Sequence, residues 1–115
     1  MVSSAFFISK IEMNLFQQLG LQDTILQAIQ DLGFQTPSEV QEKAIPHLLE
    51  HDTDLVALAQ TGTGKTAAFG FPLIQKICPD NRNTQALILS PTRELCLQIT
   101  QELKNYAKYV PGLHV

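Results

Sequence analysis

The sequence has little of what several classes of protein depend on. Its 115 residues include only two cysteines, Cys78 and Cys96, and no tryptophan. Two separated thiols without a CxxC pair exclude a disulfide framework or a zinc knuckle and suit a reducing compartment, so we expect a cytoplasmic protein. Apolar runs are also short. None approaches the ~18 residues that cross a bilayer, which predicts that the protein has no membrane partner.

Positive charge is scarce as well. Eight Lys and Arg stand against eleven Asp and Glu, which gives a formal net charge of −3. This balance argues against a broad basic field for nucleic acid, so any contact with phosphates must be local. With 44% hydrophobic and 17% charged residues, the chain is too apolar to be intrinsically disordered. Its length allows one domain at most.

Four segments have the apolar spacing of amphipathic helices. Gly33 is suited to end the first of them in a left-handed turn. The Thr36 hydroxyl is the expected N-cap of the second, with Pro37 at the first helical position and Glu39 completing a capping box. Pro46 should bend this second helix. The predicted helices cover residues 21–32, 37–50, 65–77 and 93–109.

Two continuous apolar runs, residues 54–59 and 86–90, alternate with the last two helices. An unbroken apolar run is typical of a parallel strand that is covered on both faces. Residues 113–115 resemble the opening of a further strand. The order strand, helix, strand, helix predicts an α/β fold, with a three-layer parallel sheet and helices on both of its faces. A ligand of such a sheet binds at the carboxyl ends of the strands.

Residues 59–66 lie where the first apolar run gives way to a helix, and they match the spacing of a P-loop except for the initial alanine. Gly62 and Gly64 let backbone N–H groups approach phosphate oxygens where a Cβ would intrude. Lys65 can reach the β- and γ-phosphates, and the Thr66 hydroxyl can bind Mg²⁺, so these two carry the expected catalytic roles. The candidate nucleotide-binding residues are Ala59, Gln60, Thr61, Gly62, Thr63, Gly64, Lys65 and Thr66.

Gln41 is a candidate for reading the base of the nucleotide. It ends the stretch 33–41, in the first turn of the second predicted helix. A glutamine amide presents a donor and an acceptor side by side, which matches the N6 and N7 edge of adenine. Taken alone, an exposed glutamine at a capped helix start explains this stretch equally well.

Together with the P-loop, residues 33–41 resemble the Q motif of DEAD-box RNA helicases, and residues 91–95 (Pro-Thr-Arg-Glu-Leu) resemble their motif Ia. The three motifs occur in the family's order, and the resemblance extends from residue 14 to residue 115. It implies that ATP and Mg²⁺ are the cofactors. It further implies that Phe16 stacks on the adenine while Gln41 reads its edge. The family's P-loop usually begins with alanine, so Ala59 agrees with it.

Motif Ia also has a physical interpretation as an RNA contact. At a helix start, free backbone N–H groups and the Thr92 hydroxyl, beside Arg93, form an anion site suited to a sugar-phosphate backbone of any sequence. Without the resemblance, a capped helix with Arg93 paired to a nearby acid is the simpler interpretation. The candidate RNA-binding residues are Pro91, Thr92, Arg93 and Glu94.

A rival pattern is His47-Leu48-Leu49-Glu50-His51, which matches the HxxEH sequence of inverted zinc peptidases. Such a site needs a third ligand, and the downstream candidates are Glu94, which belongs to motif Ia, and Glu102. Solvated polar residues at a helix end are the simpler explanation. We therefore predict no metal site other than Mg²⁺ at Thr66.

The resemblance divides the chain into three parts: residues 1–13, a leader that is disordered or precedes a start at Met13; residues 14–42, the Q-motif region; and residues 43–115, an incomplete RecA-like ATP-binding domain. It implies the N-terminal portion of an ATP-dependent RNA helicase. The acidic motif that holds Mg²⁺ and the second RecA-like domain, which supplies arginines, are missing from the sequence. The chain alone is therefore expected neither to hydrolyse ATP nor to unwind RNA. A stand-alone nucleotide-binding module is the alternative.

Overall fold

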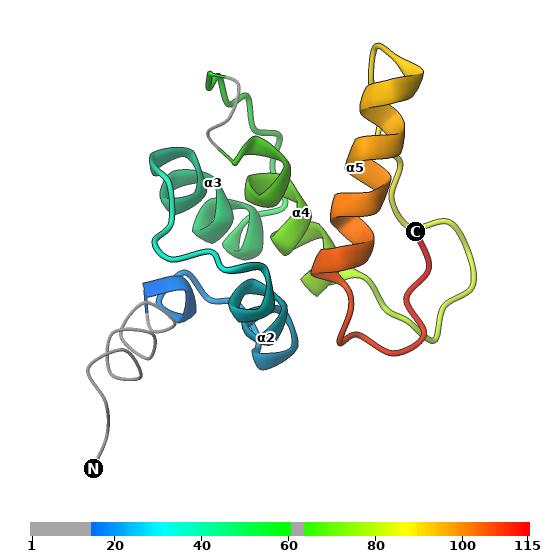
Figure 1. The fold of residues 1–115 in the computed structure, drawn as a ribbon, viewed down its shortest axis with the longest axis horizontal. Coiled ribbons are helices and arrows are strands. Elements are labelled where there is room, and N and C mark those ends of the chain that lie inside the picture. The colour runs from blue at the N-terminus through cyan, green and yellow to red at the C-terminus, as the bar shows by residue number, and fades with distance from the viewer. Residues whose placement is uncertain (1–14, 61–63) are drawn as a thin grey trace.

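The computed structural model describes residues 15–60 and 64–115 (Figure 1). The expected leader, residues 1–13, and the P-loop residues Thr61, Gly62 and Thr63 lie outside this part of the chain. After a helical stretch at residues 15–17, the elements in order are α2 (Asp23–Leu32), α3 (Glu39–Glu50), α4 (Lys65–Lys76) and α5 (Arg93–Tyr106).

The helix α2 ends where the sequence predicts. Gly33 has φ 75° and ψ 18°, which is the left-handed conformation of a helix C-cap. The Phe34 N–H then donates to the Ile29 carbonyl at 3.2 Å, which satisfies an acceptor that the helix end leaves free. The helix begins at Asp23, two residues later than predicted.

The predicted cap of α3 is wrong by two residues. Ser38, and not Thr36, is the N-cap, because its Oγ accepts from the Gln41 N–H at 3.4 Å while the Gln41 Oε1 accepts from the Ser38 N–H at 3.0 Å. Glu39 takes no part in this capping box, since its carboxylate pairs with Lys43 at 2.8 Å one turn further along the helix. The helix therefore begins at Glu39 instead of Pro37.

The helix α5 is three residues shorter than predicted. After Tyr106 the chain turns, and Lys108 and Tyr109 reach Asp31 on α2. The Tyr109 hydroxyl donates to the Asp31 carboxylate, and the Lys108 Nζ lies 3.1 Å from the same oxygen. The hydroxyl and then the ammonium hold the pKa of Asp31 below its usual range. Residues 108 and 109 therefore contact α2 instead of continuing α5.

The core lies among the helices, with α4 packed against both α3 and α5, and α2 packed against α5 (Figure 1). Phe71 on α4 is fully buried, and its ring lies 4.7 Å from Tyr106 and 6.0 Å from Phe34. The helices α4 and α5 lie close together at Gly70, where an added Cβ would lie 2.9 Å from the Leu103 side chain. A glycine at this position therefore lets the two helices approach.

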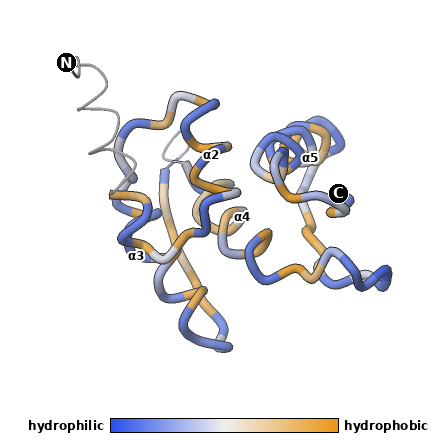
Figure 2. The backbone as a smooth tube through the Cα atoms, turned by 90° about the horizontal axis from the view of Figure 1, so that it is seen from below, coloured by the Kyte–Doolittle hydropathy of each residue, from blue (hydrophilic) through white to orange (hydrophobic). Residues whose placement is uncertain are grey.

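The predicted strands are absent from residues 15–60 and 64–115, so the parallel sheet is not formed there. A β-ladder requires a partner strand, and neither apolar run pairs with the other or with residues 113–115. Figure 2 shows these hydrophobic stretches outside the helices. Several of their side chains are largely exposed: Val56 (86%), Leu58 (94%), Leu87 (80%) and Leu89 (84%).

Candidate nucleotide-binding site

The start of α3 meets the start of α4 through a glutamine side chain. The Gln41 Nε2 donates to the Gly64 carbonyl at 3.2 Å, and the same carbonyl accepts from the Ala68 N–H at 3.1 Å. Gly64 is the N-cap of α4, the helix that begins with Lys65 and Thr66. The structure thus brings the candidate base-reading residue to the candidate phosphate-binding helix.

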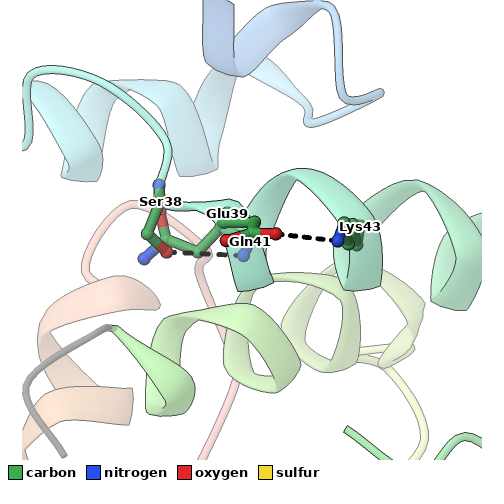
Figure 3. A network of polar contacts seen from close by, with 4 residues as sticks. All are labelled: Ser38, Glu39, Gln41 and Lys43. Carbon is green, nitrogen blue, oxygen red and sulfur yellow. Dashed lines mark hydrogen bonds and ion pairs between the residues drawn. The ribbon is translucent and has the colours of Figure 1, made fainter. Parts of the chain in front are cut away.

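The Gln41 amide is oriented from two sides. Its side chain is only 5% exposed, although the sequence alone suggested that it could be an exposed residue. Oε1 is held by the Ser38 backbone and Nε2 by the Gly64 carbonyl, which leaves one N–H and one lone pair of the amide free. Figure 3 shows Ser38 and Gln41 together, with Glu39 paired to Lys43. Ser38 is not among the residues predicted from the sequence to form the cap, although the Ser-x-x-Gln spacing is a capping-box signal.

Gly64 has no room for a side chain. Its φ of 80° lies in the left-handed region, and an added Cβ would lie 2.2 Å from the Gln41 Nε2 and 3.2 Å from its Cδ. Contacts below 3 Å require one group to move. The glycine is therefore required both by its backbone conformation and by the glutamine packed against it.

Lys65 and Thr66 occupy the first turn of α4. Lys65 is exposed and Thr66 is half-buried, and this turn contains no acidic residue. Within the described residues Lys65 forms no ion pair, so its ammonium is not neutralised there. A helix N-terminus with free N–H groups and an unpaired lysine is chemically suited to bind phosphate.

A cavity of about 620 Å³ lies beside the start of α3. Ser38 and Lys43 are on its α3 side, and Ala59 and Gln60 line it from the segment that precedes the P-loop. Of the candidate residues, Ala59 and Gln60 therefore line this cavity, whereas Gly64, Lys65 and Thr66 are at the start of α4.

Phe16 is buried in the core of the protein. Its ring is 1% exposed and packs between Phe34 and Phe71, with centroids 6.5 Å away in each case. Phe71 belongs to the core and Phe34 is partly buried against it, so the Phe16 ring offers no open face to a base. The predicted stacking on adenine stays a prediction, and it requires this packing to open.

The motif Ia residues form a separate helix start. The Thr92 Oγ1 accepts from the Leu95 N–H at 3.1 Å, which makes Thr92 the N-cap of α5. Pro91, Arg93 and Glu94 are exposed. Across the ranges that the structure describes, Arg93 has no ion pair, so the simpler interpretation that pairs it with an acid is not observed.

The two histidines of the rival zinc pattern lie side by side at the end of α3, where His51 is the C-cap. Their ring centroids are 4.8 Å apart, and the His47 Nε2 lies 3.3 Å from the Thr53 hydroxyl. In residues 15–60 and 64–115 no group of three His, Cys, Asp or Glu is placed to hold a metal ion. The same residues contain no helix long and apolar enough to cross a membrane.

The sequence profile of the DEAD/DEAH box helicase family matches residues 38–115. The chain is 46% identical over 100 residues to the ATP-dependent RNA helicase DeaD of Haemophilus influenzae, an alignment that covers 87% of this chain and 16% of the relative. It is 42% identical over 97 residues to the DEAD-box ATP-dependent RNA helicase CshA of Bacillus cereus, covering 84% and 18%. The chain thus spans less than a fifth of the length of these relatives.

Solved structures agree with the sequence matches. Dbp5 of S. cerevisiae, bound to RNA and ADP BeF3, superimposes with a TM-score of 0.77 at 38% identity, covering 83% of this chain and 25% of that chain. A DEAD box protein from Methanococcus jannaschii superimposes with a TM-score of 0.75 at 44% identity, covering 79% and 25%. The described helices therefore have the arrangement found in the corresponding part of these P-loop proteins.

Proposed function

Because the chain belongs to the DEAD/DEAH box helicase family, we propose that it is the N-terminal, nucleotide-binding portion of an ATP-dependent RNA helicase. The observation that carries the proposal is the hydrogen bond from Gln41 to Gly64, since it joins the candidate base-reading residue to the phosphate-binding helix. Residues 14–42 are the Q-motif region, and residues 43–115 are part of a RecA-like domain.

We propose that the described helices belong to an α/β fold with a central sheet. Residues 54–59 and 86–90 are the strands of a three-layer parallel sheet, with helices on both faces. The exposure of Val56, Leu58, Leu87 and Leu89 supports this, because large apolar side chains are normally covered. These segments form the backbone hydrogen bonds of a β-sheet when partner strands lie beside them.

The phosphates of ATP are proposed to bind at the start of α4. Lys65 neutralises the β- and γ-phosphates, and the Thr66 hydroxyl binds Mg²⁺, which supplies positive charge to the transferring phosphoryl group. The fit rests on a helix start without acidic residues and on Lys65, which forms no ion pair in residues 15–60 and 64–115.

The adenine is proposed to be read by Gln41. With Ser38 and Gly64 fixing its amide, the remaining N–H and lone pair can face the N7 and N6 positions of the base. Phe16 is the proposed stacking residue, and this role requires its ring to leave the packing between Phe34 and Phe71.

RNA is proposed to bind by its backbone at the start of α5. The Thr92 cap presents a helix N-terminus, and the unpaired Arg93 beside it supplies positive charge, with Pro91 and Glu94 completing the motif. Backbone contacts carry no base information, so the binding is independent of RNA sequence. The second RecA-like domain, which supplies arginines to the γ-phosphate, belongs to the full-length protein.

The test of the proposed function is RNA-stimulated hydrolysis. We expect the full-length protein to release phosphate from Mg-ATP faster when single-stranded RNA is added, because the transition state needs both domains assembled around the nucleotide. The Lys65→Ala protein provides the background rate. Turnover that is insensitive to RNA, or equal in the Lys65→Ala protein, contradicts the proposal.

Replacing Gln41 by alanine should narrow the difference in affinity between ATP and GTP by about 1–3 kcal/mol, because guanine presents an acceptor where adenine presents an amine. Calorimetric titration of both nucleotides measures this difference. Ser38→Ala is the matched control, since it removes the capping hydroxyl and leaves the amide in place. A preference for ATP that both variants retain in full would show that Gln41 does not read the base.

A further inference from the structure

Gln75, near the end of α4, binds a distant turn with both ends of its amide. Its Oε1 accepts from the Gln22 N–H at 2.8 Å, and its Nε2 donates to the Gly20 carbonyl at 2.8 Å. Gln22 is the N-cap of α2, and no side chain of its own caps that helix. Gln75 therefore satisfies a free donor and a free acceptor of the turn that leads into α2.

The turn held by Gln75 has little freedom to shift. Gly20 adopts φ 100°, a conformation that other residues rarely take, and an added Cβ there would lie 3.2 Å from the Leu49 side chain on α3. The turn follows directly on the helical residues 15–17, which include Phe16. Holding the turn in place therefore limits the positions that the preceding residues 15–17 can take.

The same face of α4 holds that segment at a second point. Phe71 precedes Gln75 by four residues, so the two side chains lie one above the other on the helix. Phe71 contacts the Phe16 ring edge-on at a centroid distance of 6.5 Å. Stacking on a base requires the Phe16 ring to leave Phe71, so the two hydrogen bonds of Gln75 are the contacts that keep the turn attached to α4 when the ring moves. The helix α4 begins at the phosphate-binding Lys65.

We propose that Gln75 is a positioning residue for nucleotide binding, which keeps the Phe16 segment in register with the phosphate-binding helix. The proposal rests on the proposed function, in which Phe16 stacks on the base. Gln75 itself lies ten residues beyond Lys65, about 15 Å along the helix, so it does not touch the phosphates. Its effect reaches the nucleotide through the turn and the aromatic ring.

The experiment compares ligands with and without a base in the full-length protein. Gln75→Leu removes both hydrogen bonds at similar side-chain size, and Gln75→Glu keeps the acceptor for Gln22 but sets a carboxylate against the Gly20 carbonyl. Gln27→Leu is the matched control, because Gln27 is an exposed glutamine on α2. Calorimetry gives the affinities for ATP and for inorganic tripolyphosphate, and thermal unfolding shows that each variant is folded.

We expect Gln75→Leu to weaken ATP binding about three- to tenfold, the equivalent of about one hydrogen bond, while tripolyphosphate binding changes less than about twofold. Gln75→Glu should also weaken the binding of ATP more than that of tripolyphosphate, with a smaller loss of ATP affinity. This variant decides the result if the leucine variant does not fold. Equal losses for both ligands, or no loss, overturn the proposal. If the unmodified protein binds neither ligand through Lys65, the proposed function fails, and this inference fails with it.

Discussion

Alanine in place of Lys65 is expected to weaken ATP binding in the full-length protein by about 1.5–3 kcal/mol, the usual value of a charge-assisted hydrogen bond. The structure supports this size of effect because Lys65 opens α4 and, in the part of the chain that is described, has no acidic partner to release first. Calorimetric titration with Mg-ATP measures the change.

Lys76→Ala is the control for this measurement. It changes the net charge of the protein by the same amount, but Lys76 is at the other end of α4, where its ammonium pairs with Asp52. Its effect on ATP affinity should be small. Equal affinities in the Lys65→Ala protein and the unmodified protein would remove the P-loop assignment.

Replacing Gly64 by alanine is expected to lower both the free energy of unfolding and the affinity for ATP. The left-handed backbone costs about 1–2 kcal/mol with any L side chain, and the new Cβ would force the Gln41 amide off the Gly64 carbonyl. Losing that hydrogen bond costs about 0.5–1.5 kcal/mol more. Denaturant unfolding should therefore show a loss of about 1.5–3.5 kcal/mol, and ATP affinity should fall because Gln41 is displaced.

Gly33→Ala separates the two contributions to this loss. Gly33 also has a positive φ, 75°, but no atom lies within 4 Å of a Cβ added there. It should lose only the backbone contribution and leave ATP affinity unchanged. The double replacement Gly64→Ala with Gln41→Ala should lose less than the sum of the single changes, because the clash is gone. Additive losses would show that the two residues do not interact.

The helices could be predicted from the sequence because their signals are local. Apolar spacing placed α2 and α4 to within two residues, and Gly33 is the left-handed stop that a C-cap needs. The cap of α3 was misplaced because two capping boxes overlap there, and only the fold shows that Glu39 is taken by Lys43. Local patterns thus found the elements but could not choose between neighbouring caps.

The arrangement of the candidate site depended on contacts between distant residues. Nothing in the motif spacing shows that Gln41 would bind the Gly64 carbonyl, 23 residues away, or that Gln75 would hold a turn more than fifty residues earlier. The apolar runs were correctly identified as hydrophobic segments, but a strand also needs a partner, which the pattern of a single segment does not contain. Phe16 has an aromatic ring of the kind that stacks on bases, but the ring is buried in the core.

The close contact of Gly70 with Leu103 lies at different distances from the starts of α4 and α5. It lies five residues from Lys65 along α4 and ten residues from Arg93 along α5, or about 7.5 Å and 15 Å of helix. A given rotation of α5 about this contact would therefore displace its Thr92–Arg93 end about twice as far as the same rotation of α4 would displace Lys65.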